Sequence, residues 1–97
     1  MELPAIRLYV GEARLLAITV SRGGVDITPD ASTFRVVDSD GEDVIPTSPA
    51  GISGTQVYYL IGPSDVTAAA GGYKAIWTIT RGDEVFIATQ QITVQSL

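Results

Sequence analysis

The sequence predicts an all-β fold, an antiparallel β-sandwich of seven or eight strands. Short runs rich in valine, isoleucine, threonine and tyrosine alternate between apolar and polar residues, which is the pattern of half-buried strands. Clusters of glycine, proline, aspartate and serine separate these runs. The chain has 97 residues, 45% of them hydrophobic, enough to bury one core. We therefore expect a single domain over residues 1–97.

Eight runs are expected to form strands. In chain order they are Ala5 to Val10, Ala13 to Val20, Val25 to Thr28, Thr33 to Asp38, Glu42 to Ile45, Thr55 to Ile61, Tyr73 to Thr80 and Glu84 to Gln95. Three dipeptides between them, Gly23-Gly24, Asp40-Gly41 and Gly82-Asp83, tolerate the positive φ angles of primed two-residue turns. Each of these dipeptides predicts a hairpin.

Two connections have a different composition. The segment GPSDVTAAAGGY, residues 62–73, predicts a crossover between the sheets with a short helical turn near residues 64–70, because proline and serine can start such a turn and glycine can end it. The uncharged segment IPTSPAGISGT, residues 45–55, holds two prolines and two glycines. It predicts a mobile loop or a ragged sheet edge.

A turn at Gly82-Asp83 fixes which residues face each other in the last hairpin. It places Arg81 opposite Glu84, an opposite-charge pair, and it continues with Ile79 opposite Phe86, Trp77 opposite Ala88, and Tyr73 opposite Ile92. The inward face then supplies the structural core residues Tyr73, Trp77, Ile79 and Phe86. Gln90 is the one polar residue on that face, and we expect a bulge near Gln90-Gln91 to accommodate it.

The outer face of the same hairpin carries Ile76, Val85 and Ile87 among threonines. A water-exposed sheet face should tend toward polar residues, so this cluster is the predicted protein-contact site. It would pack against a second copy of the chain or a neighbouring protein. The alternative is β-propensity alone, since branched residues favour strands even when they are exposed.

Two short motifs are interpreted as turns. Arg81-Gly82-Asp83 matches the tripeptide that integrins recognise, but here it occupies a tight hairpin in which glycine and aspartate form the turn. The segment DSDGED, residues 38–43, holds four carboxylates that could bind a hard cation, with Asp38 expected opposite Asp43. Its glycine does not match the spacing of an EF-hand loop, so a solvated acidic turn is the better interpretation.

Composition excludes several classes of function. The chain contains no cysteine and no histidine, so it lacks thiolate metal ligands, disulfides and the commonest general base. It also has no glycine-rich phosphate loop, and we expect no enzyme activity, no metal and no cofactor. Its six basic residues are scattered in a chain of net charge −5, which disfavours nucleic acid. No run of eighteen apolar residues occurs, so no membrane span is expected.

Tyr73 gives the sandwich a more specific character. It follows Gly71-Gly72 and begins an apolar strand, the position of the tyrosine corner in immunoglobulin-like domains. In antibody domains a cysteine would stand two residues later, where this chain has Ala75, and the tryptophan would lie on an earlier strand than Trp77 does. The sequence therefore predicts an immunoglobulin-like architecture rather than an antibody-type domain.

Four segments in order carry a resemblance that covers nearly the whole chain: ITVSRGGVDIT, FRVVDSDGEDVI, VYYLIGPSDVTAAAGGYKAIWTI and RGDEVFIATQQITV. In this order the sequence resembles the small immunoglobulin-like domains of tailed-phage and prophage structural proteins, such as the N-terminal domain of baseplate upper proteins. The resemblance implies a non-catalytic assembly module of a tail, baseplate or head, without a cofactor.

Several expectations follow from this resemblance. Its partners would be other virion structural proteins or itself, as a homo-oligomer, and it would be located in the virion after synthesis in the bacterial host cytoplasm. The alternative is a receptor- or carbohydrate-binding module of a phage or bacterial surface protein. Such a module would use loops such as residues 46–55 and exposed rings, for which Tyr9, Tyr58 and Tyr59 are the candidates.

Overall fold

The computed structural model describes residues 2–67 and 69–96, and these fold into a β-sandwich without a helix. The strands are β1 (Glu2–Tyr9), β2 (Arg14–Thr19), β3 (Ser21–Arg22), β4 (Val25–Asp26), β5 (Ala31–Val37), β6 (Asp43–Pro49), β7 (Gly51–Ser53), β8 (Gln56–Ile61), β9 (Ala70–Arg81) and β10 (Glu84–Gln95). The predicted all-β sandwich is confirmed. β3 and β7, which are only two and three residues long, were not expected.

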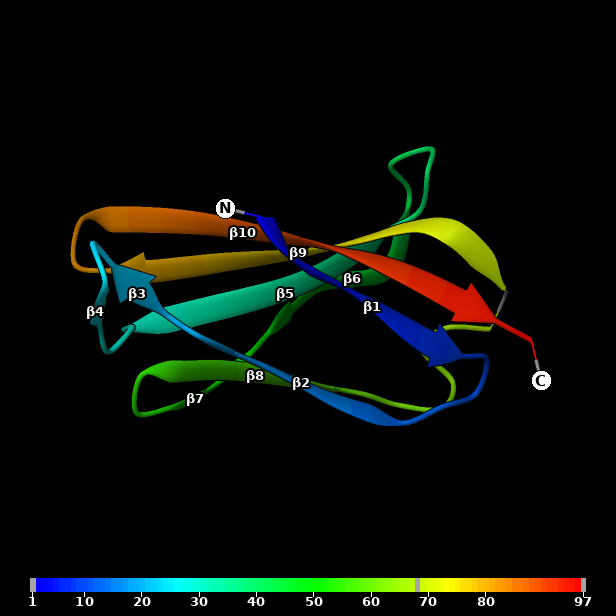
Figure 1. The fold of residues 1–97 in the computed structure, drawn as a ribbon, viewed down its shortest axis with the longest axis horizontal. Coiled ribbons are helices and arrows are strands. Elements are labelled where there is room, and N and C mark those ends of the chain that lie inside the picture. Colours follow the sequence, from blue (N-terminus) through cyan, green and yellow to red (C-terminus); the bar gives the residue numbers. More distant parts are fainter. Residues whose placement is uncertain (1, 68, 97) are drawn as a thin grey trace.

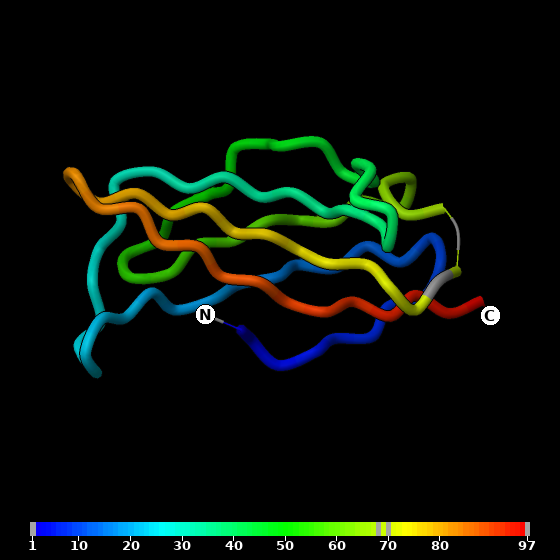
Figure 2. Tube along the Cα trace, turned by 90° about the horizontal axis from the view of Figure 1, so that it is seen from above, coloured from blue at the N-terminus to red at the C-terminus, as the bar shows by residue number. Residues whose placement is uncertain are grey.

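The strands form two facing layers and a small hairpin (Figure 1). One sheet has five strands in the order β1-β10-β9-β5-β6, and the other has three in the order β2-β8-β7. β3 and β4 pair only with each other. Seen from above, β1 runs along β10, and their pairing is parallel (Figure 2). The rest of the pairing is antiparallel.

The β9–β10 hairpin has the predicted register. Glu84 pairs with Arg81, Phe86 with Ile79, and Ala88 with Trp77. Gly82 has a φ of 57°, which lets the chain reverse in two residues. The turn at Gly23-Gly24 is confirmed as well, because both glycines have positive φ and Arg22 pairs with Val25.

The predicted two-residue turn at Asp40-Gly41 is wrong by one residue. Asp38 donates its backbone N–H to the Glu42 carbonyl at 2.9 Å, so three residues form the loop and Asp43 pairs with Val37 instead of Asp38. The Asp38 carboxylate explains the difference. Its Oδ1 accepts the N–H groups of Asp40 and Glu42 at 2.9 and 3.0 Å, which favours this wider turn.

The segment 62–73 crosses from the three-stranded to the five-stranded sheet as predicted, but its described residues contain no helix. Asp65 closes a turn instead, since its Oδ2 accepts the Gly62 N–H at 2.7 Å. Val66 then enters the core. Ala68, part of the predicted helical turn, lies outside the described residues.

The segment 45–55 is a strand switch rather than a loop. β6 runs to Pro49 at the edge of the five-stranded sheet, and β7 starts at Gly51 in the other sheet. The Ala50 N–H donates to the Ser32 carbonyl between them. The ragged-edge prediction is confirmed, because the pairing of β6 with β5 shifts register twice. Edge strands tolerate the missing N–H of proline, so Pro46 and Pro49 fit there.

The core lies between the two sheets and centres on three aromatic rings. Phe34 on β5 stacks on Tyr59 of β8, with ring centroids 4.5 Å apart, and meets Trp77 edge-on at 4.6 Å. Trp77, Ile79 and Tyr73 are all buried, while Phe86 is half-buried at the margin of the core. A partner for the Tyr73 hydroxyl in a tyrosine corner stays a prediction.

The irregularity predicted near Gln90-Gln91 lies slightly farther along β10. The pairing of β10 with β9 is regular at both glutamines and shifts register between Ile92 and Val94, while the pairing of β1 with β10 shifts between Leu3 and Ile6. Proline at position 4 has no N–H for the ladder. Gln90 points inward, is buried, and donates its Nε2 to the Pro4 carbonyl at 3.0 Å. Gln90, the polar residue on the core face, therefore supplies a hydrogen bond to β1 at the point where the pairing of that strand is interrupted.

Candidate protein-contact surface

The predicted contact residues lie on the outer face of the five-stranded sheet. Val85 and Ile87 alternate along β10 and are 61% and 55% exposed. Ile76 on β9 is half-buried, flanked by Thr89 on one side and Arg35 on the other. The exposed apolar surface is therefore formed by Val85 and Ile87, and Ile76 supports it from the next strand. We call these three residues the β10 patch.

Two ion pairs border the β10 patch. Arg35 beside Ile76 contacts Asp43 at 2.5 Å, and Arg22 on β3 contacts Glu84, next to Val85, also at 2.5 Å. Glu84 therefore pairs with Arg22, although Arg81 lies opposite it in the hairpin as predicted. All four side chains are well exposed, so these pairs add little stability. An apolar centre with a charged border is typical of protein interfaces.

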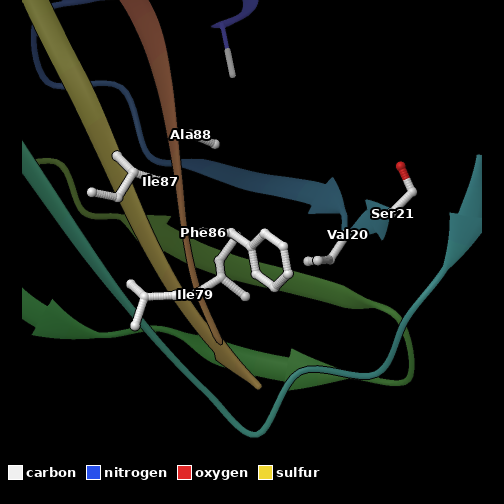
Figure 3. Close-up of a pocket in the computed structure, with 7 residues that line it drawn as sticks. Val20, Ser21, Ile79, Phe86, Ile87 and Ala88 are labelled. Carbon is white, nitrogen blue, oxygen red and sulfur yellow. The ribbon is translucent and has the colours of Figure 1, made fainter. Parts of the chain in front are cut away.

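A hollow of about 330 Å³ adjoins the patch (Figure 3). It is lined by Val20 and Ser21, by residues 85–88 of β10, and by Ile79 of β9. Figure 3 shows the Phe86 ring directed toward Val20, which explains why Phe86 is only half-buried. The lining is apolar except for Ser21. An apolar side chain from another protein would fit this hollow.

A second apolar surface, which the sequence did not predict, lies on the outer face of the three-stranded sheet. Leu15 on β2 pairs directly with Leu60 on β8, and they are 58% and 62% exposed. Tyr58 also points outward and covers Gly51, where an added Cβ would lie 2.1 Å from the ring. We call Leu15, Leu60 and Tyr58 the β8 patch. The two leucines are 45 positions apart (60 − 15), so only knowledge of the strand pairing reveals that they adjoin.

The Arg81-Gly82-Asp83 turn is held at its base. The Gly82 N–H donates to Asp30 Oδ2 at 2.6 Å, and Glu84, the next residue, is paired with Arg22. This is a tight two-residue turn tied to the loop before β5. It lacks the long protruding loop that the integrin interpretation requires.

The tyrosines proposed for sugar binding do not gather. Tyr59 points inward and stacks on Phe34. Tyr9 and Tyr58 are exposed, but one lies at the end of β1 and the other in the middle of β8, on different sheets. Residues 46–49 of the proposed binding loop belong to β6, and residues 51–53 belong to β7.

Ionisable groups give little support to catalysis. A hydrogen bond from the Tyr9 backbone N–H, 3.0 Å from Glu12 Oε1, together with the neighbouring Arg14 guanidinium, lowers the pKa of the Glu12 carboxyl below 4.5. This arrangement stabilises the β1–β2 connection.

Within residues 2–67 and 69–96, no three acidic side chains gather to hold a metal ion. The same residues include no helix that could cross a bilayer.

No protein-family model and no curated protein matches the sequence. Solved structures do match the fold. A chimeric titin Z1Z2 carrying a decorin peptide aligns with 97% of this chain and 88% of its own, at 14% identity and a TM-score of 0.59. Titin domain M7 aligns with 96% of this chain over 87% of its own length, at 10% identity and a TM-score of 0.58. The extracellular domain of the sodium channel β4 subunit aligns with 99% of this chain over 92% of its own length, at 16% identity and a TM-score of 0.50.

The chain thus has an immunoglobulin-like fold. The strand order agrees with this, because β2 and β8 pair in one sheet and β10, β9 and β5 adjoin in the other. Phe34 on β5 packs against Trp77 at the centre of the core. In antibody domains a buried tryptophan packed against a disulfide occupies this central region. At these identities the likeness shows the fold alone.

Proposed function

We propose that the chain is a non-catalytic assembly module of a phage or prophage particle, a component of a tail, baseplate or head, and that it acts through protein contacts made by the β10 patch. One observation carries the proposal: Val85 and Ile87 are exposed together beside an apolar hollow of about 330 Å³. Exposed apolar surface next to a concave apolar site is typical of the anchor regions of interfaces.

The phage context is supported by the four ordered sequence segments that resemble virion immunoglobulin-like domains. In this proposal the chain is made in the bacterial host cytoplasm and is then incorporated into the virion. Its partner at the β10 patch is another structural protein of the particle or a second copy of the chain. A receptor- or carbohydrate-binding role is less well supported, because the exposed rings of Tyr9 and Tyr58 lie on different sheets.

Incorporation into particles tests this proposal. In a strain that encodes the chain, particles would be induced and purified, and their content of the chain measured by quantitative mass spectrometry. We expect the wild-type chain to be present and Val85→Lys with Ile87→Lys to be depleted at least about ten-fold, because lysine cannot enter a desolvated apolar contact. Both positions are exposed, so the variant should fold.

Val25→Lys is the matched control, since Val25 is 65% exposed on the β3–β4 hairpin, outside the patch. It should be incorporated like the wild type. If purified particles lack the wild-type chain, the phage context is wrong. If the folded double variant is incorporated normally, the contact does not involve the β10 patch.

A further inference from the structure

The outer face of the three-stranded sheet is free of charge. Its outward side chains belong to Leu15, Ala17 and Thr19 on β2, Gln56, Tyr58 and Leu60 on β8, and Gly51 and Ser53 on β7. None of these eight residues is charged at neutral pH, in a chain with 17 charged residues and a net charge of −5. No other described element covers this face, which lies on the lower side in Figure 1.

The charge distribution makes this the face through which a second copy of the chain meets the least repulsion. Two copies of charge −5 repel each other, so they approach best through faces that carry no charge themselves. An uncharged face also gives no electrostatic selection for a different, charged partner. The β10 patch differs in this respect, because two ion pairs border it.

The relief of the face is self-complementary. β7 begins at Gly51, which pairs with Tyr58, so β7 has no residue beside Leu60. The face is therefore lower on that side of Leu60, and on the other side of Leu60 lies Leu15. We call this lower area the step. A two-fold axis parallel to the strands keeps each level opposite itself and exchanges the β2 and β7 sides. Leu15 of each copy then enters the step beside Leu60 of the other. At the opposite end, Thr19 of each copy meets Ser53 of the other and Gln56 meets its own equivalent, and these groups can hydrogen-bond.

We propose that the chain forms a two-fold dimer through the β8 patch, with the outer faces of the two three-stranded sheets packed together. This contact is separate from the one in the proposed function, and it leaves the β10 patch on each copy available to another protein. Three strands of up to six residues span roughly 15 by 20 Å. This is less than the ~800 Å² per partner of a standard interface, so the dimer dissociates at low concentration.

Sedimentation equilibrium of the purified full chain over a wide concentration range tests the dimer. We expect a reversible monomer–dimer equilibrium for the wild type. Leu15→Lys with Leu60→Lys should weaken it at least about ten-fold, because two lysines per copy would be desolvated in a small contact. Val85→Lys with Ile87→Lys introduces the same charge on the opposite sheet and should dimerise like the wild type. Circular dichroism would confirm that both variants are folded.

Three results would overturn the proposal: a wild-type chain that stays monomeric at millimolar concentration, an unchanged dimer in the Leu15/Leu60 variant, or a dimer abolished by the Val85/Ile87 variant alone. The last result would support the β10 patch as the self-contact. If the lysine variant does not fold, Leu15→Thr with Leu60→Thr keeps branched, strand-compatible residues and replaces it. Amide chemical-shift changes on dilution provide a second measurement, expected in β2, β7 and β8.

Discussion

At the scale of single residues, Trp77 is the centre of the core. It is fully buried and meets Phe34 edge-on, and its Nε1 has no hydrogen-bond acceptor among the described residues. Trp77→Ala should lower the free energy of unfolding by about 3–5 kcal/mol because it leaves a large cavity. Trp77→Phe should cost clearly less, since it keeps a ring and removes the unpaired donor. Urea unfolding measures both, and equal losses would contradict this account.

A glycine is required at position 51 because the Tyr58 ring packs on it, and not because of its backbone conformation. Its φ is not positive, but a Cβ there would lie 2.1 Å from the Tyr58 ring. Gly51→Ala should destabilise the domain by about 1–3 kcal/mol, because the ring must leave its place on the sheet. In a Tyr58→Ala background the same substitution should be nearly neutral, and a double-mutant cycle measures the coupling. Additive effects would show that the ring does not pack on Gly51.

At the scale of elements, the interruption of β1 depends on Gln90. Its amide donates to the Pro4 carbonyl, where the register of β1 shifts. Gln90→Leu keeps the volume but removes the donor, and the loss of this part-buried hydrogen bond should cost about 0.5–1.5 kcal/mol. We expect faster amide hydrogen exchange in Ile6–Tyr9 than in the wild type, with β9 unaffected. Uniformly faster exchange would mean that Gln90 supports the whole sheet instead.

The β1–β2 connection should respond to acid. The Glu12 carboxylate accepts the Tyr9 N–H and pairs with Arg14, so its pKa is lower in the folded chain than the ordinary 4.5. The ionised form is the stabilising one, and its contribution is therefore present above pH 4.5 and is lost as the pH falls through the lower, folded value. Glu12→Gln should reduce this pH dependence below about pH 4.5. Thermal unfolding of both proteins across this range provides the measurement.

Local chemistry explains which elements the sequence could predict. The Gly82-Asp83 turn determined the register of β9 and β10, and with it the inward and outward faces, because side chains alternate strictly along a strand. The turn in DSDGED could not be placed from the Asp40-Gly41 dipeptide alone, because hydrogen bonds from the Asp40 and Glu42 N–H groups to the Asp38 carboxylate stabilise a three-residue loop. β7 was missed because its three residues, Gly51–Ser53, are too few to show a periodic pattern and begin with a glycine.

At the scale of the whole molecule, the two candidate contact surfaces differ in how far the sequence alone could predict them. The β10 patch lies within one hairpin, so local register revealed it. The β8 patch joins β2 to β8 across 45 positions, and only the tertiary pairing brings Leu15 to Leu60. The two patches lie on opposite sheets of the sandwich. Under the two proposals above, the chain would bind a second copy through the β8 patch and another protein through the β10 patch.

The net charge of the molecule gives the proposed dimer a distinctive response to salt. Each copy carries −5, while the eight residues of the contact face carry no charge. The Debye length falls from about 30 Å at 0.01 M salt to about 10 Å at 0.1 M, so added salt screens the repulsion between copies. We expect the dimer to tighten about two- to ten-fold over this range. Sedimentation equilibrium at several salt concentrations measures the change. A dimer that salt weakens would contain ion pairs, and its contact would then lie on a charged surface such as the border of the β10 patch.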